Sequence, residues 1–175
     1  MPNWCSNTAI INAPRPVIDE LRQVLEDARA GADRGLLGWM RPMPQSEQEN
    51  WYDWNVSNWG TKWEVHEVYV NDATEEDSIT ISFDSAWSPP VEAFRHWAEQ
   101  DGRVTFTLKY YEPGMGYVGE ANYDGDYYDD DCVSQQDDPA RFEEIASDEW
   151  GYEPEEEPEP LTEWYEQGVK DKGLA

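Results

Sequence analysis

The residues of this sequence that could do chemistry are mainly carboxylates, and they are concentrated in its last third. The chain of 175 residues carries 39 Asp and Glu against 12 Lys and Arg, which gives a formal net charge of −27. In the densest run, residues 124–131, five of eight side chains are acidic. Clustered carboxylates can bind a divalent metal, form an acid–base pair, or present a charged surface to a basic partner.

Spacing argues against a dedicated metal site in this run. Aligned as an EF-hand loop that begins at Asp124, the sequence places Asp126 correctly at the third position and Tyr128 at the fifth. Asp129 then stands where glycine is needed, and Gln135 stands where the terminal glutamate is needed. We therefore expect no metal ligand set, and only an adventitious cation site stays open. A hydrolase that uses clustered carboxylates and a divalent metal is a third possibility without supporting spacing.

Other catalytic motifs are incomplete. Residues 114–119 match GxGxxG, but the acidic segment that follows lacks the helix that would face a dinucleotide pyrophosphate. The two histidines, His66 and His96, have no nucleophile or ligand at recognisable spacing. Cys5 and Cys132 show neither metal nor redox spacing. We expect no catalytic residue, no cofactor and no enzymatic activity.

The negative charge is polarised along the chain. Residues 111–175 hold 21 acids and 3 bases, whereas residues 1–110 hold 18 acids and 9 bases. Such a field repels nucleic acid and anionic membranes and attracts basic surfaces, which in cells are mostly those that bind nucleic acid. Carboxylates two apart on a strand lie about 6.6 Å apart, and those three or four apart on a helix lie about 5–6 Å apart, so a rigid acidic surface can imitate the phosphates of DNA. The predicted partner-binding residues are Asp124, Asp126, Asp129, Asp130, Asp131, Asp137, Asp138, Glu143, Glu144, Asp148, Glu149 and Glu153.

Hydrophobic periodicity predicts the elements that position these residues. Alternating or β-rich runs predict strands at residues 4–12, 63–70, 78–84, 104–110 and 117–123, and a buried stripe with end signals predicts helices at about residues 16–30 and 89–101. The order strand, helix, strand, strand, helix, strand predicts an α+β, ferredoxin-like antiparallel sheet with two helices on one face. We expect this domain at residues 1–124.

Two further segments complete the predicted organisation. Residues 125–175 read as an acidic C-terminal extension packed on the domain, with a short helix at 140–149, a linker at 153–160 and a docking turn at 161–168. Residues 35–60 read as an irregular insertion rich in tryptophan. We expect its aromatic residues to pack the insertion onto the sheet, and we expect Lys62 to pair with an acid. These aromatic residues are Trp51, Trp54, Trp59 and Trp63.

Five segments are shared with a known family: Met1-Pro-Asn-Trp-Cys-Ser-Asn7, Arg41-Pro-Met-Pro44, Asn58-Trp-Gly-Thr-Lys-Trp63, Ala86-Trp-Ser-Pro-Pro90 and Tyr111-Glu-Pro-Gly-Met-Gly116. Over about residues 1–120 the chain thus resembles the YubB ferredoxin-like family of phage and plasmid proteins. The resemblance implies a ferredoxin-like domain in a mobile-element protein of a bacterial cytoplasm, and it brings no catalytic residue. The absence of a signal peptide or an apolar run of about 18 residues also favours a cytoplasmic protein.

Two functions follow as expectations. The first is a non-enzymatic, DNA-mimic-like inhibitor of a host nucleic-acid-binding defence system, such as CRISPR-Cas or restriction. Its partner would be a basic nucleic-acid-binding protein or complex of the host, with no direct contact to nucleic acid or membrane. The alternative is a small-ligand or phage-replication binding module that uses the aromatic insertion, with the acidity serving solubility only.

Overall fold

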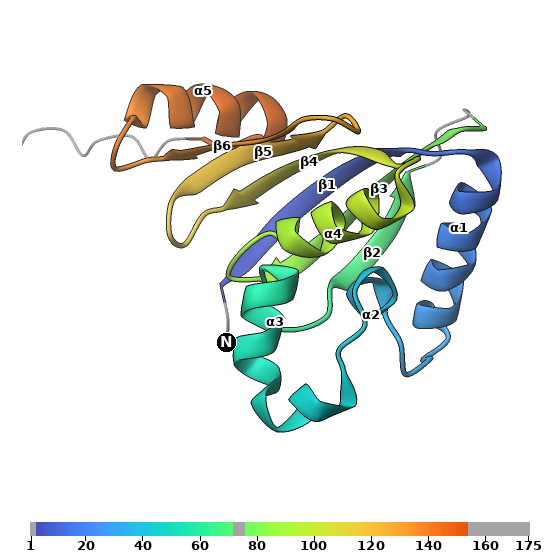
Figure 1. The fold of residues 1–175 in the computed structure, drawn as a ribbon. Helices are drawn as coiled ribbons and strands as arrows, with labels where there is room; N and C mark the ends of the chain where they lie inside the picture. Colours follow the sequence, from blue (N-terminus) through green and yellow to red (C-terminus); the bar gives the residue numbers. More distant parts are fainter. Residues whose placement is uncertain (1–2, 72–75, 154–175) are drawn as a thin grey trace, which may run out of the picture.

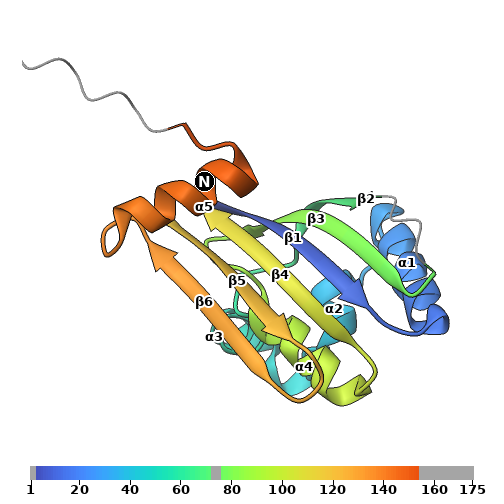
Figure 2. The same cartoon turned by 90° about the horizontal axis from the view of Figure 1, so that it is seen from above.

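The computed structural model describes residues 3–71 and 76–153, which form one six-stranded antiparallel sheet and the helices that cover it. The strands lie in the order β2-β3-β1-β4-β5-β6, as Figure 2 shows. The first four in this order have the arrangement of a ferredoxin-like sheet, and β5 and β6 extend it beyond β4. The strand bounds are β1 Trp4–Asn12, β2 His66–Asn71, β3 Ser78–Ala86, β4 Thr105–Glu112, β5 Tyr117–Tyr123 and β6 Tyr128–Ser134.

The helices divide between the two faces of the sheet. Four α-helices lie on one side, and α5 lies on the other (Figure 1). Their bounds are α1 Arg15–Arg29, α2 Leu36–Met40, α3 Trp51–Trp59, α4 Val91–Asp101 and α5 Pro139–Trp150, with a 3₁₀ helix at Gln45–Asn50 before α3. The predicted α+β, ferredoxin-like class is confirmed, and the two predicted helices are α1 and α4 on the same face.

The main core forms between α1, α4 and one face of the sheet. In β4 the residues Phe106, Leu108 and Tyr110 are buried and alternate with half-buried polar neighbours, as the period of two predicted. The Phe94 ring of α4 lies 5.9 Å from the Phe83 ring of β3 and 5.6 Å from the Phe106 ring. These aromatic contacts fix α4 across the middle of the sheet.

The predicted irregular insertion is largely helical, which is a correction. Residues 51–59 form α3, which buries Asn55 and Trp59 one turn apart and ends at Gly60 with a φ of +86°. The run that follows α3 leads to β2, which begins at His66 rather than at the predicted residue 63. Aromatic residues lie on all sides of α3, so no single apolar stripe indicated a helical period in the sequence.

A strand that the sequence did not predict lies inside the acidic run. Residues Tyr128–Ser134 form β6, which pairs with β5 from Tyr123↔Tyr128 to Tyr117↔Ser134. The division of the chain at residue 124 stays a prediction, while β6, beyond it, belongs to the same sheet as β5. The short helix predicted at 140–149 corresponds to α5, and the predicted linker at 153–160 and docking turn at 161–168 lie outside the described residues from 154 on.

Gly119 makes a close approach possible between β5 and its neighbours. A Cβ added there would overlap the Tyr110 hydroxyl and lie 2.7 Å from the backbone carbonyl oxygen of Asp131. The missing side chain lets the Tyr110 ring cross β5 toward β6.

We expect Gly119→Ala to lower the free energy of unfolding by about 1–3 kcal/mol, because the backbone of β6 must shift to admit the methyl group. Urea unfolding followed by tryptophan fluorescence measures the change. Gly38→Ala is the matched control, because its added Cβ would meet only ordinary contacts, at 3.5 Å from the Arg34 Cγ. A loss at Gly119 no larger than at Gly38 would contradict the close packing of Tyr110 against β5.

Candidate functional site

The face of the sheet opposite the main core carries aligned polar side chains on β4, β5 and β6. Register places Lys109 beside Glu120 and Glu120 beside Asp131 in one row across the three strands. The next row consists of Thr107, Asn122 and Asp129. Helix α5 crosses one end of this face and leaves the rest of it open, as Figure 2 shows.

A second, smaller core attaches α5 to the sheet. Phe142 and Ala146 of α5 are buried against Val118 of β5 and Val133 of β6. Tyr111 extends this core, with its ring 6.1 Å from that of Phe142 and 6.0 Å from that of Trp150. The helix is therefore fixed by apolar contact, although it carries four acids, Glu143, Glu144, Asp148 and Glu149.

Capping residues set the two ends of α5. The Asp138 carboxylate accepts a hydrogen bond from the Arg141 backbone N–H at 3.1 Å, and Pro139 occupies the first helical position. Gly151 ends the helix with a φ of +66°. One of the predicted partner-binding acids, Asp138, is therefore a helix cap.

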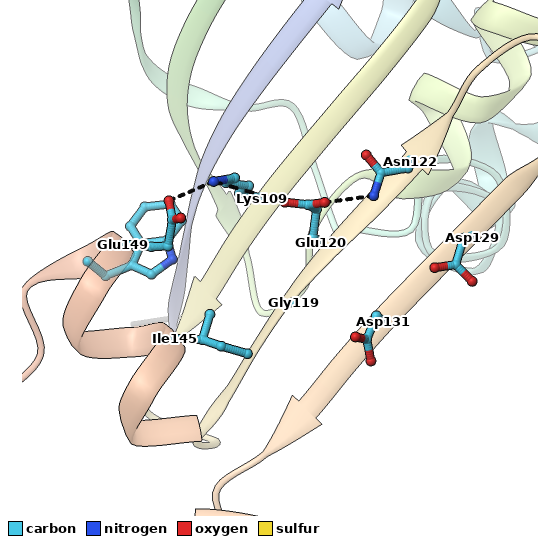
Figure 3. A pocket seen from close by; sticks show the side chains of 9 residues that line it. Lys109, Gly119, Glu120, Asn122, Asp129, Asp131, Ile145 and Glu149 are labelled. Atoms are coloured by element: carbon cyan, nitrogen blue, oxygen red, sulfur yellow. Dashed lines mark hydrogen bonds and ion pairs between the residues drawn. The ribbon is translucent and has the colours of Figure 1, made fainter. Parts of the chain in front are cut away.

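A pocket of about 320 Å³ lies between α5 and the open face (Figure 3). Lys109 lies between two carboxylates, with its Nζ 2.7 Å from Glu149 of α5 and 4.0 Å from Glu120. Asn122 Nδ2 donates a hydrogen bond to Glu120 at 2.8 Å. The pocket is lined by Lys109, Gly119, Glu120, Asn122, Asp129, Asp131, Ile145, Glu149 and Trp150.

The three consecutive acids of β6, residues 129–131, alternate between the two faces of the sheet, so Asp129 and Asp131, which are two apart, share one face. Asp129 and Asp131 line the pocket on the open face, and Asp131 forms an ion pair with Arg141. Asp130 points to the opposite face, where its carboxylate accepts a hydrogen bond from the Tyr110 hydroxyl at 2.6 Å. Burial, together with this carboxylate, raises the pKa of Tyr110, so the hydroxyl stays protonated and donates.

The turn between β5 and β6 uses Asp124 as a structural residue. Its carboxylate accepts backbone N–H groups from Tyr127 at 2.8 Å and from Asp126 at 3.0 Å. These two hydrogen bonds lower the pKa of Asp124. Asp126 itself is exposed at the tip of the turn.

The remaining predicted acids lie on or beside α5. Glu144, Asp148 and Glu149 are exposed on the helix, and Glu143 is half-buried. Asp137 is exposed in the turn before α5, and Glu153 is exposed after it. The structure thus brings these acids together around β6 and α5, except Asp130, which faces the other side of the sheet.

Six pocket residues were not predicted: Lys109, Glu120, Asn122, Gly119, Ile145 and Trp150. The alternation of β4 and β5 could have placed the first three on one face. The place of Trp150 beside the pocket could not be predicted, because it depends on how α5 docks beside β4.

The aromatic insertion packs as predicted for part of its length. Trp59 is buried, its Nε1 donates to the Arg41 carbonyl at 2.8 Å, and Trp54 packs on it with ring centroids 5.7 Å apart. Trp51 is exposed. Lys62 does not pair with an acid among the described residues, since its Nζ lies 4.6 Å from the Trp63 ring and 4.5 Å from the Trp87 ring instead.

The structure shows where the GxGxxG segment and His66, for which we expect no catalytic role, lie. Residues 114–116 lie in the turn between β4 and β5, and residues 117–119 belong to β5. In the turn, the buried Glu112 carboxylate accepts the N–H groups of Gly114 and Met115. His66 packs its ring 5.2 Å from that of Trp4. Across residues 3–71 and 76–153, no three His, Cys, Asp or Glu side chains converge as metal ligands would. None of the described helices is long and apolar enough to cross a membrane.

A family model described as the ferredoxin-like domain in Api92-like protein matches residues 58–159. The chain belongs to this family. The crystal structure of the protein Api92 from Yersinia pseudotuberculosis is similar, with a TM-score of 0.53 and 11% identity over 77% of this chain and 99% of that chain. At this identity the likeness concerns the fold. No curated protein matches the sequence. The predicted ferredoxin-like family is confirmed at that level, while the narrower YubB assignment stays a prediction.

We expect Lys109→Met to lower the free energy of unfolding by about 1 kcal/mol, because Glu120 and Glu149 would then repel each other without the cation that lies between them. Added salt should reduce this loss by screening the repulsion. Urea unfolding at low and high salt measures both effects. Arg15→Met removes an exposed pair with Asp19 and is the control; an equal loss there would contradict a special role for Lys109.

The two thiols should differ in reactivity. Burial raises the pKa of Cys5 to about 12, whereas Cys132 is exposed. Burial and the nearby aspartates also raise the pKa of Cys132, so its reaction should be slower than that of free cysteine. With Ellman's reagent, we expect one thiol to react in the native protein and the second only in denaturant. Reaction of both thiols in the native wild-type protein would contradict the burial of Cys5.

Proposed function

We propose that this protein is a non-enzymatic, DNA-mimic-like inhibitor that binds the basic nucleic-acid channel of a host defence protein, such as a CRISPR complex or a restriction enzyme. It would do so through an acidic surface, defined here as the exposed carboxylates of residues 124–153. One observation carries the proposal: these carboxylates stand on a hydrogen-bonded strand and a docked helix. A rigid surface avoids the entropic cost that a disordered acidic tail would incur on binding.

The charge density of this unit is comparable with that of DNA. Residues 117–153 hold 13 acids and one base, Arg141. At the rises of strand and helix, β6 and α5 each extend roughly 20 Å. B-DNA carries about 12 phosphate charges over the same length of axis. With Asp130 on the opposite face of the sheet, at most 12 of these acids can face one channel, which is still similar to the charge of the duplex.

Cations on the protein neutralise only the inner part of this surface. Lys109 and Arg141 pair with Glu149 and Asp131 beside the pocket. Four exposed acids, called the outer acids below, form no ion pair within the described residues. They are Asp126, Asp137, Glu144 and Asp148. Binding to a basic channel would be steered by these outer charges, and it would be fast and sensitive to salt.

The proposed setting is a bacterial cytoplasm, with a mobile element as the source of the protein. The support for it is the resemblance of five sequence segments to phage and plasmid proteins, together with the field of the chain, which repels nucleic acid itself. Solubility alone requires no docked acidic helix, because dispersed surface charges serve it equally well.

We expect reversal of the four outer acids to abolish partner binding while the fold stays intact, because none of them makes a side-chain contact that holds the described structure. The test variant combines Asp126→Lys, Asp137→Lys, Glu144→Lys and Asp148→Lys. A pull-down from bacterial lysate, eluted with a salt gradient or with short duplex DNA, measures binding. Wild type should retain a nucleic-acid-binding protein that moderate salt and DNA both release.

A control with the same change in net charge separates position from charge. It combines Glu26→Lys, Glu49→Lys, Asp53→Lys and Asp77→Lys, all exposed and outside the acidic surface. This control should retain the partner, with a reduced association rate at low salt. Equal retention of the partner by the test variant and by the control would contradict the proposal.

A further inference from the structure

A second pocket, of about 390 Å³, lies within the insertion on the opposite side of the sheet from α5. Helix α3 contributes Asn55 and Trp59 to it, and the segment after α3 contributes Trp63 and Glu64. Met43, from the segment before the 3₁₀ helix, also lines it. The pocket has the volume and the mainly apolar walls of a small-molecule site.

Two polar atoms of this pocket are buried without a partner. Asn55 is only 4% exposed, and its Nδ2 donates to the Lys62 carbonyl at 2.9 Å. That bond fixes the orientation of the amide, since a carbonyl accepts only from the nitrogen. Within the described residues, Asn55 Oδ1 then has no donor and Trp63 Nε1 has no acceptor. An unpaired acceptor and an unpaired donor in one pocket are costly to the fold and favour a ligand that satisfies both.

The other polar groups of the pocket are already engaged. Both oxygens of Glu64 accept backbone N–H groups, with Leu37 N at 2.8 Å from one and Gly38 N at 3.1 Å from the other. Trp59 Nε1 donates to the Arg41 carbonyl. The guanidinium of Arg34 donates to the Gly38 carbonyl at 3.0 Å. The exception is the exposed Asp33 carboxylate, which also lines the pocket. Among the buried polar atoms the free hydrogen-bonding capacity is therefore one neutral acceptor and one neutral donor.

We propose that this pocket binds a small neutral ligand through an amide group, with the ligand N–H donating to Asn55 Oδ1 and the ligand C=O accepting from Trp63 Nε1. An amide fits because it carries one donor and one acceptor, and a neutral ligand fits because both unpaired atoms are uncharged and the net charge of −27 repels anions. Nucleobases and carboxamides share this chemistry. The site uses none of the acidic-surface residues, so it goes beyond the inhibitor function.

Entry requires a small movement of the pocket wall. Asn55 Oδ1 and Trp63 Nε1 are both covered in the ligand-free structure. Met43 and Arg34 line the pocket and have long side chains with several rotamers. For entry, we expect a rotamer change at either one to uncover the polar pair while α3 stays in place.

The test uses uracil and benzamide as probes, with 1,3-dimethyluracil as a probe that keeps the carbonyls but has no N–H. Calorimetric titration of the full chain at millimolar probe concentrations should show binding of uracil, benzamide or both, and none of 1,3-dimethyluracil. Uracil alone would assign a nucleobase as the ligand, and benzamide alone would assign a carboxamide. Binding of neither would overturn the proposal, because water alone would then satisfy the pair.

Trp63→Phe isolates the hydrogen bond, since it keeps an aromatic ring and removes the Nε1 donor. We expect binding of the active probe to weaken about 10-fold, the equivalent of one lost hydrogen bond. The unliganded variant should fold, because the substitution removes an unpaired buried donor. Trp51→Phe, outside the pocket and exposed, is the matched control and should bind as wild type does. Unchanged affinity in Trp63→Phe, or an equal loss in Trp51→Phe, would overturn the proposal.

Discussion

The pairing of β6 with β5 is the constraint on which the acidic side of this protein depends. Once the register is set, alternate residues of β6 must point to opposite faces. Asp129 and Asp131 therefore reach the open face, and Asp130 turns to the Tyr110 hydroxyl. The same alternation places Val133 beneath α5. The pocket, the anchoring of the helix and the distribution of charge thus follow from one set of backbone hydrogen bonds.

An edge strand with this many acids is stable only if apolar contacts offset the repulsion between them. Burial of one large apolar side chain contributes about 1.5–3 kcal/mol, whereas one exposed charge pair contributes about 0.2–1 kcal/mol. The burial of Phe142 against Val118 and Val133 therefore outweighs several repulsive pairs on α5. Lys109 and Arg141 add cations that pair with Glu149 of α5 and Asp131 of β6. The charge on β6 also protects the sheet edge, because it discourages pairing with another strand.

The ferredoxin-like part could be predicted because its buried positions have clean periods, as β4 and α1 do. The strand β6 could not, because aspartates occupy both of its faces and erase the alternation between apolar and polar residues. For the same reason the sequence showed a cluster of acids at 129–131 but not which of them share a face. The structural role of Asp124 depends on backbone N–H groups, which composition does not reveal, whereas Asp138 directly before Pro139 is a helix-start signal in the sequence. The helix α3 was missed because its apolar residues surround it rather than forming one stripe.

The two proposed sites lie on opposite sides of the sheet, with α5 on one side and the insertion on the other (Figure 1). Their chemistry also differs. The acidic surface presents unpaired charge, whereas the insertion pocket contains an unpaired neutral donor and acceptor. The field of the acidic surface extends across a chain of this size at low ionic strength, because the Debye length is then about 30 Å. It therefore works against any anionic ligand in the insertion pocket and leaves a neutral one unaffected. A small-ligand site and a charged protein-binding surface are thus physically compatible in one domain, and substitutions in one should leave the other working.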